Sequence, residues 1–202
     1  MEKKKAGYLE GFVAIFVNLA LFALKYWAGI VSGSIALMAD AWHTLSDSIS
    51  SVVVILGAKL ASKKPDKDHP YGHGRWELVS SIIIAIILVL IAFGFIREAI
   101  GQLRIQESAS FGTVALVVTI VSIVVKELMA QLAFYLGRKS GNTAVKADGW
   151  HHRTDALSSL VILIGILIKD YFWWIDGVLG IAVSLMLMYA AFKILMEAVD
   201  KI

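Results

Sequence analysis

Long apolar runs, separated by short polar and charged stretches, make up most of the 202-residue chain. Each run is close to the ~20 residues that a helix needs to span a bilayer. A transmembrane barrel would instead need short segments of alternating polarity, and these runs are continuous. The pattern predicts an all-α membrane protein with six transmembrane helices, at residues 8–31, 34–61, 78–100, 111–136, 144–168 and 173–195.

Composition agrees with this fold class. The chain is 58% hydrophobic and 17% charged, whereas soluble domains carry roughly 25% charged residues. It has no cysteine, which excludes disulfides and thiolate metal sites. The first apolar run contains Asn18 and Lys25 and lacks a clear cleavage site, so we expect a retained helix rather than a signal peptide.

The lysines and arginines predict the orientation in the membrane. They stand in short clusters between apolar runs, which is typical of topology signals and gives no indication of nucleic-acid binding. With the N-terminus inside, eleven of them near the helix ends fall on the cytoplasmic side and three fall outside. Both termini are therefore predicted to be cytoplasmic, in a multi-pass protein of the cell (inner) membrane.

A polar motif occurs twice within the apolar sequence. Residues 39–51 and 147–159 align at a constant offset of 108 residues. The two copies lie on the second and fifth helices, an offset of three helices, so the second copy is inverted in the membrane, which predicts two inverted three-helix halves. This is a recurring plan in transporters, with a polar site near the midplane. The aligned identical pairs are Asp40 with Asp148, Trp42 with Trp150, His43 with His151, and Asp47 with Asp155.

Each copy places a histidine and an aspartate four residues apart, on one helix face. We expect His43 and Asp47 on the second helix to converge with His151 and Asp155 on the fifth. Two imidazoles and two carboxylates suit a tetrahedral divalent ion, zinc above all, although Co²⁺, Fe²⁺, Mn²⁺ and Cd²⁺ also fit these ligands. Burying the carboxylates without a cation would cost several kcal/mol.

Several polar neighbours need a separate interpretation. His152 lies ~100° round the helix from His151, so both the repeat and the helical register select His151. Asp40 and Asp148 are either proton-relay or supporting groups of the metal site, or helix-packing partners. For Lys126, Glu127 and Gln131 we expect snorkelling and helix pairing near the inner end of the fourth helix.

A metal site at mid-membrane favours transport over a structural role. Neutral histidine and ionised aspartate bind metal, and their protonated forms do not, so a proton gradient could drive metal export. One alternative is a membrane metalloenzyme, but such a site needs more histidines on one face. A bis-histidine haem protein is a second alternative, and Asp47 and Asp155 fit poorly against a porphyrin. A purely structural module would leave the paired carboxylates unexplained. We therefore predict a transporter rather than an enzyme.

These motifs, together with Gly29, Gly33-Ser34 and the His-Pro-Tyr-Gly-His-Gly-Arg run, resemble the cation diffusion facilitator family of divalent-metal/proton antiporters. The resemblance implies a tetrahedral transport site at His43, Asp47, His151 and Asp155, and a homodimer that works by rocking of helices. With a histidine at the first ligand position, His43, the chain resembles the zinc-type members of the family. The family usually continues into a cytoplasmic domain that this chain, ending at Ile202, is expected to lack, either as a naturally short member or as the membrane domain alone.

The segment between the second and third helices offers further ligands. Asp66, His69 and His73 stand at spacings of three and four, with Pro70 and glycines forcing turns between them. Some family members bind a second metal at matching positions. The sequence is consistent with a weak or regulatory cytoplasmic metal site, and also with a solvated loop at the lipid headgroups.

Overall fold

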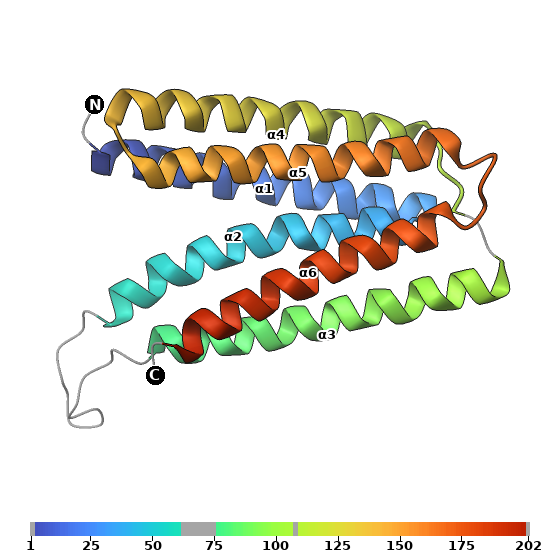
Figure 1. Ribbon diagram of the computed structural model, residues 1–202, viewed down its shortest axis with the longest axis horizontal. Coiled ribbons are helices and arrows are strands. Elements are labelled where there is room, and N and C mark those ends of the chain that lie inside the picture. Colours follow the sequence, from blue (N-terminus) through green and yellow to red (C-terminus); the bar gives the residue numbers. More distant parts are fainter. Residues whose placement is uncertain (1–2, 62–75, 107–108, 201–202) are drawn as a thin grey trace.

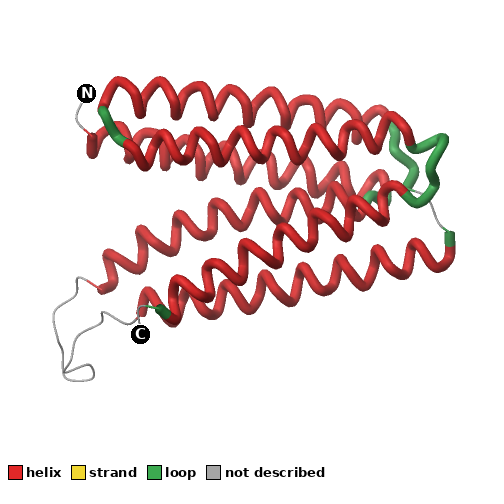
Figure 2. The backbone as a smooth tube through the Cα atoms, viewed as in Figure 1, coloured by secondary structure: helices red, strands yellow, loops and turns green. Residues whose placement is uncertain are grey.

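Six long helices, and no strands, make up the parts of the chain that the computed structural model describes, which are residues 3–61, 76–106 and 109–200 (Figure 1 and Figure 2). The all-α fold class predicted from the apolar pattern is confirmed. The helices are α1 (Lys3–Ser32), α2 (Ile35–Ala61), α3 (Trp76–Ile105), α4 (Thr113–Ser140), α5 (Thr143–Ile168) and α6 (Ile175–Val199).

Successive helices run in opposite directions, so both ends of the chain lie at the same end of the bundle (Figure 1). Below we call this the terminal end. Helix α4 packs on α5 and on α1, α1 packs on α2, and α3 and α6 form a pair that lies against α2. Helix α2 is therefore central, and its contacts with α5 bring the two copies of the polar motif together.

The outer surface of the bundle is strongly apolar. Large side chains such as Phe16, Leu90 and Tyr189 are 77%, 64% and 71% exposed, an arrangement that would be costly in water and is favourable in lipid. Five of the helices are long and apolar enough to cross a membrane, and α2 carries the first polar motif. The chain is a multi-pass integral membrane protein.

The end of α2 farthest from the chain termini is held by buried hydrogen bonds. The Ser34 hydroxyl accepts from the Leu37 N–H at 3.1 Å and donates to Asp176 Oδ1 at 2.5 Å. Asp176 Oδ2 accepts from the Ile35 N–H at 2.9 Å. These contacts cap the start of α2, where helix N–H groups lack internal partners, and tie it to α6.

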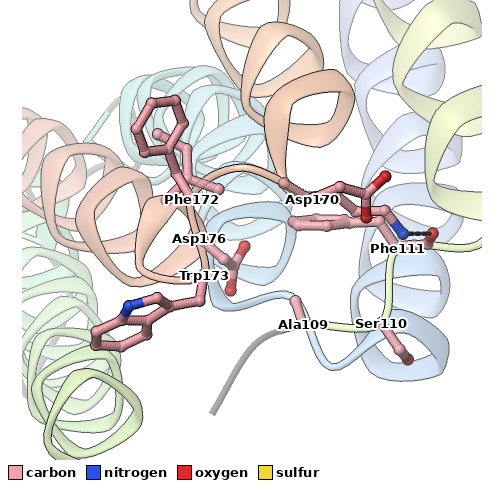
Figure 3. A pocket seen from close by; sticks show the side chains of 9 residues that line it. Ala109, Ser110, Phe111, Asp170, Phe172, Trp173 and Asp176 are labelled. Carbon is pink, nitrogen blue, oxygen red and sulfur yellow. Dashed lines mark hydrogen bonds between the residues drawn. The ribbon is translucent and has the colours of Figure 1, made fainter. Parts of the chain in front are cut away.

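Asp176 also lies in a cavity of about 240 Å³ at this end, among Ala109, Ser110, Trp173 and neighbouring residues (Figure 3). Lys169 also lines this cavity and donates to the Phe111 carbonyl at 2.7 Å. Both oxygens of the Asp176 carboxylate already accept hydrogen bonds, from the Ser34 hydroxyl and the Ile35 N–H. We therefore interpret Asp176 as a structural residue that holds α2 against α6.

A tight turn sets the position of α5. Gly141 takes φ +64°, in the left-handed region that favours glycine, and ends α4. Asn142 then caps α5 by accepting from the Ala144 and Val145 N–H groups. At Gly149, an added Cβ would lie 2.9 Å from the Phe134 ring, so the glycine allows α5 to pack closely on α4.

Candidate metal centre

His43 and Asp47 on α2 meet His151 and Asp155 on α5. His151 Nε2 lies 3.3 Å from Asp47 Oδ1 and 3.8 Å from Asp155 Oδ2, and His43 Nε2 lies 3.9 Å from Asp155 Oδ1. One ligand atom from each of His43, Asp47 and Asp155 can be chosen so that all three lie within 4.8 Å of one another. The structure therefore brings together the four residues that the repeated motif selects.

These separations can be compared with the geometry of a zinc site. Zinc binds imidazole nitrogen and carboxylate oxygen at roughly 2.0–2.2 Å, so tetrahedral ligand atoms stand about 3.4 Å apart. The three separations of 3.3–3.9 Å between a histidine and an aspartate of this set are close to this value. His43, Asp47 and Asp155 form the group that could hold an ion, and His151 lies beside it in contact with both carboxylates.

The four side chains differ in their access to solvent. The side chains of His43 and Asp155 are 10% and 7% exposed, whereas that of His151 is 48% exposed. Asp47 and His151 line a cleft of about 510 Å³ whose other walls include Gly7, Glu10 and Glu197, residues close to the ends of the chain. The cleft therefore connects Asp47 and His151 with the terminal end of the bundle.

Lys126 of α4 is also part of the site. Its side chain is fully buried, and its ammonium lies 2.7 Å from Asp155 Oδ2 and 3.6 Å from Asp47 Oδ2. The expectation that Lys126 snorkels is wrong, because the ammonium is held by two of the four predicted ligands. A signal was present in the sequence, since Thr119, Ser122 and Lys126 share one buried face of α4.

The neighbours of Lys126 do show the expected helix pairing. Glu127 accepts from Arg153 of α5 at 2.7 Å and from Gln131 at 2.7 Å. These groups lie at the more exposed margin of the α4–α5 contact. Adjacent residues on α4 thus have different roles because they lie on different faces.

Asp40 lies one turn from the site, on the side away from the terminal end. It pairs with Lys25 of α1 at 2.7 Å and accepts from the Ser159 hydroxyl at 3.2 Å. Lys25 also donates to Thr44 at 3.1 Å and to Ser159 at 3.2 Å. This buried network joins α1, α2 and α5, and the contacts favour helix packing over a direct role toward the metal.

Asp148 and His152 lie on the opposite side, in the cleft. Both line its wall, and His152 Nε2 is 3.2 Å from Glu10 Oε1 of α1. His152 therefore turns toward α1 rather than toward the four ligands, as the helical register predicts. The aligned residues Asp40 and Asp148 have unlike surroundings, because one is enclosed in the bundle and the other faces the cleft.

The residues of the predicted loop site, Asp66, His69 and His73, lie outside the described residues. That site stays a prediction from the sequence.

Comparison with known proteins gives consistent results. A family model described as the cation efflux transmembrane domain matches residues 11–202. An uncharacterised transporter of Methanocaldococcus jannaschii is 39% identical over 189 residues, which are 93% of this chain and 67% of the relative. The manganese efflux system protein MneP of Bacillus subtilis is 31% identical over 211 residues, covering 98% of this chain and 68% of MneP.

A plant relative is similar over much of this chain but over less of its own length. Metal tolerance protein C1 of Arabidopsis thaliana is 33% identical over 199 residues, which cover 90% of this chain and 42% of the plant protein. The chain spans about half to two thirds of the length of most of these curated relatives. The family model nonetheless covers nearly all of the chain, which therefore belongs to the cation efflux family, the cation diffusion facilitators.

Proposed function

We propose that the protein carries divalent metal cations, zinc foremost, out of the cytoplasm in exchange for protons, using His43, Asp47, His151 and Asp155 as its transport site. The observation that carries this proposal is the convergence of the four side chains, with three histidine–aspartate contacts of 3.3–3.9 Å, beside a cleft that reaches one end of the bundle. A carrier needs a binding site that solvent can reach in this way.

The choice of zinc rests on the two imidazoles. Magnesium and calcium prefer oxygen ligands, whereas imidazole with carboxylate suits zinc and its transition-metal neighbours. The names of relatives mention manganese efflux and metal tolerance, and Mn²⁺, Co²⁺, Fe²⁺ and Cd²⁺ are accordingly the next candidates. We infer that His43 and His151 select against the abundant hard cations.

Proton exchange follows from the chemistry of the same ligands. An ordinary histidine changes its charge near pH 6.5, within the physiological range. Metal binding requires the neutral imidazole and the ionised carboxylate, so protons and metal compete for the site. Protons arriving from the outer side would release the metal there and return with the carrier.

The cleft supports a state that is open toward the terminal end, which the lysines and arginines predict to be cytoplasmic. Transport then requires a second state in which the site opens toward the opposite end. In the family this change is expected to occur within a homodimer, and we extend that expectation to this chain as part of the proposal.

The test is zinc uptake into proteoliposomes that contain the purified protein, driven by an imposed pH gradient. We expect Asp47→Ala and Asp155→Ala to reduce uptake to background, because each removes a ligand. Asp170→Ala, which changes an exposed aspartate away from the site, is the matched control and should transport normally. Normal transport by the two ligand variants would refute the proposal.

The predicted loop site has a separate expected outcome. Replacing His69 and His73 together by alanine should slow or deregulate uptake without abolishing it, because these residues belong to a second site in the sequence interpretation. Complete loss of uptake in folded protein would show that the loop histidines, rather than the helix histidines, bind the transported ion.

A further inference from the structure

The buried ammonium of Lys126 lies among the proposed ligands. It is 2.7 Å from Asp155 Oδ2 and 3.6 Å from Asp47 Oδ2, and its side chain has no exposed surface. A buried charge needs partners of opposite sign to offset its desolvation. Here these partners are two carboxylates whose oxygens are also the oxygen ligands of the proposed metal site.

The ammonium contacts the Oδ2 atom of each aspartate, so a lysine and a metal ion compete for the negative charge of the same two carboxylates. A zinc ion bonded to Asp47 and Asp155 at roughly 2.0–2.2 Å from each oxygen would stand close to the ammonium. Two positive charges at such a distance, in an environment of low dielectric constant, repel each other strongly. Lysine is suited to yield, since its ammonium is a compact charge on a flexible four-carbon stem.

We propose that Lys126 is a tethered cation of the transport site, which occupies Asp47 and Asp155 before a metal binds and which the metal must displace. This inference rests on the proposed function, and it adds a residue that determines the affinity and selectivity of the site. The ammonium offsets the negative charge of the two aspartates inside the apolar bundle. It also sets a threshold, because an entering ion must bind the ligands well enough to displace the ammonium.

The threshold bears on selectivity. An ion held by two carboxylates alone gains little by exchanging with an ammonium that already neutralises them. An ion that also bonds to His43 and His151 gains two further ligands, whereas the contacts of the Lys126 ammonium are to the two carboxylates. Lys126 therefore favours ions that accept imidazole nitrogen.

The experiment is a zinc titration of the purified full-length chain by calorimetry at fixed pH. Lys126→Met keeps an unbranched side chain of similar length and removes the charge. We expect it to bind zinc at least about tenfold more tightly than the parent protein, because no cation has to be displaced. Equal or weaker binding by folded Lys126→Met would overturn the proposal.

Lys25→Met is the matched control. Lys25 is also buried and also lies 2.7 Å from an aspartate, but its partner Asp40 is one turn away from the ligands. Its zinc affinity should equal that of the parent protein. A tightening equal to that of Lys126→Met would mean that any buried positive charge weakens binding, and the specific role of Lys126 would be refuted.

A charge-retaining variant keeps the proposal testable if Lys126→Met does not fold. Lys126→Arg places a planar guanidinium, which can hold carboxylates with two parallel hydrogen bonds, against Asp47 and Asp155. It should weaken zinc binding by roughly tenfold or more; unchanged affinity would contradict the displacement mechanism. Asp155→Ala distinguishes failure of the Lys126 proposal from failure of the proposed transport site. Equal zinc binding by the parent protein and Asp155→Ala would refute the proposed function itself.

Discussion

At the scale of single residues, His43 and His151 occupy equivalent positions in the repeat but have different environments. The His43 side chain is 10% exposed, whereas that of His151 is 48% exposed and lies in the cleft. The buried histidine is therefore the better position at which to change the ligand type, since its neighbours restrict it to a few rotamers.

His43→Asp should lower the preference of the site for zinc over cadmium by severalfold. The variant replaces one imidazole by a third carboxylate, which can bind through one or two oxygens and therefore accommodates the larger Cd²⁺ ion more readily than a single imidazole nitrogen does. The measurement is competition between the two ions for the purified protein. An unchanged ratio of affinities would remove the basis for describing the site as zinc-type.

The grouping of the four proposed ligands could be predicted from the sequence because the motif is duplicated and because a spacing of four fixes a helix face. The same register separated His151 from His152, and the structure places His152 against Glu10. Lys126 could not be predicted in the same way. A single lysine in an apolar helix has no partner in its own sequence neighbourhood, and the partner Asp155 comes from the packing of α4 on α5.

At the scale of the helices, α1 and α2 approach each other closely at Gly29. A Cβ atom added there would lie 2.6 Å from Met38 Cγ and 3.0 Å from the Met38 backbone nitrogen. Because backbone atoms cannot move aside as a side-chain end can, any larger residue must push α2 away from α1. Small residues at such contacts are what allow membrane helices to pack.

Gly29→Ala should accordingly lower the free energy of unfolding by about 1–3 kcal/mol, the usual cost of overpacking. Gly94→Ala on α3 is the control, because nothing lies within 4 Å of the added atom. Thermal unfolding in detergent compares the two variants with the parent protein. A loss of stability in both, or in neither, would show that the α1–α2 contact does not depend on Gly29.

The helix positions follow from the apolar pattern, while the helix ends follow from local contacts. The third helix extends to Ile105 instead of ending at residue 100 as the apolar run predicts. Its last turns are more polar and include Arg97 and Arg104. The sixth begins at Ile175, because Phe172, Trp173 and Trp174 belong to the preceding turn. Hydrogen bonds such as that between Ser34 and Asp176 cannot be deduced from apolar runs.

At the scale of the whole molecule, the proposed transport requires water to reach the site from the end that holds both chain termini. Ala190 of α6 lines the cleft, and its neighbour Tyr189 is 71% exposed on the outer, apolar surface. The chain contains no cysteine, so a single introduced thiol is unique. These two adjacent positions therefore report on the cleft and on the lipid-facing surface at nearly the same depth.

Ala190→Cys should react much faster than Tyr189→Cys with a membrane-impermeant thiol reagent applied from the cytoplasmic side. The cleft admits water to the first position, whereas lipid covers the second. Equal rates at the two positions, measured by mass spectrometry of labelled vesicles, would show that the cleft is not a hydrated path.

The central claim is that two helices from opposite halves of the chain supply four ligands to one ion. X-ray absorption spectroscopy of the protein loaded with one equivalent of zinc, in a background that lacks His69 and His73, tests this most directly. We predict four light ligands at roughly 2.0–2.2 Å, two of them imidazoles, and the loss of one imidazole in His43→Ala and in His151→Ala. A six-coordinate oxygen shell, or a spectrum that neither variant changes, would contradict the account.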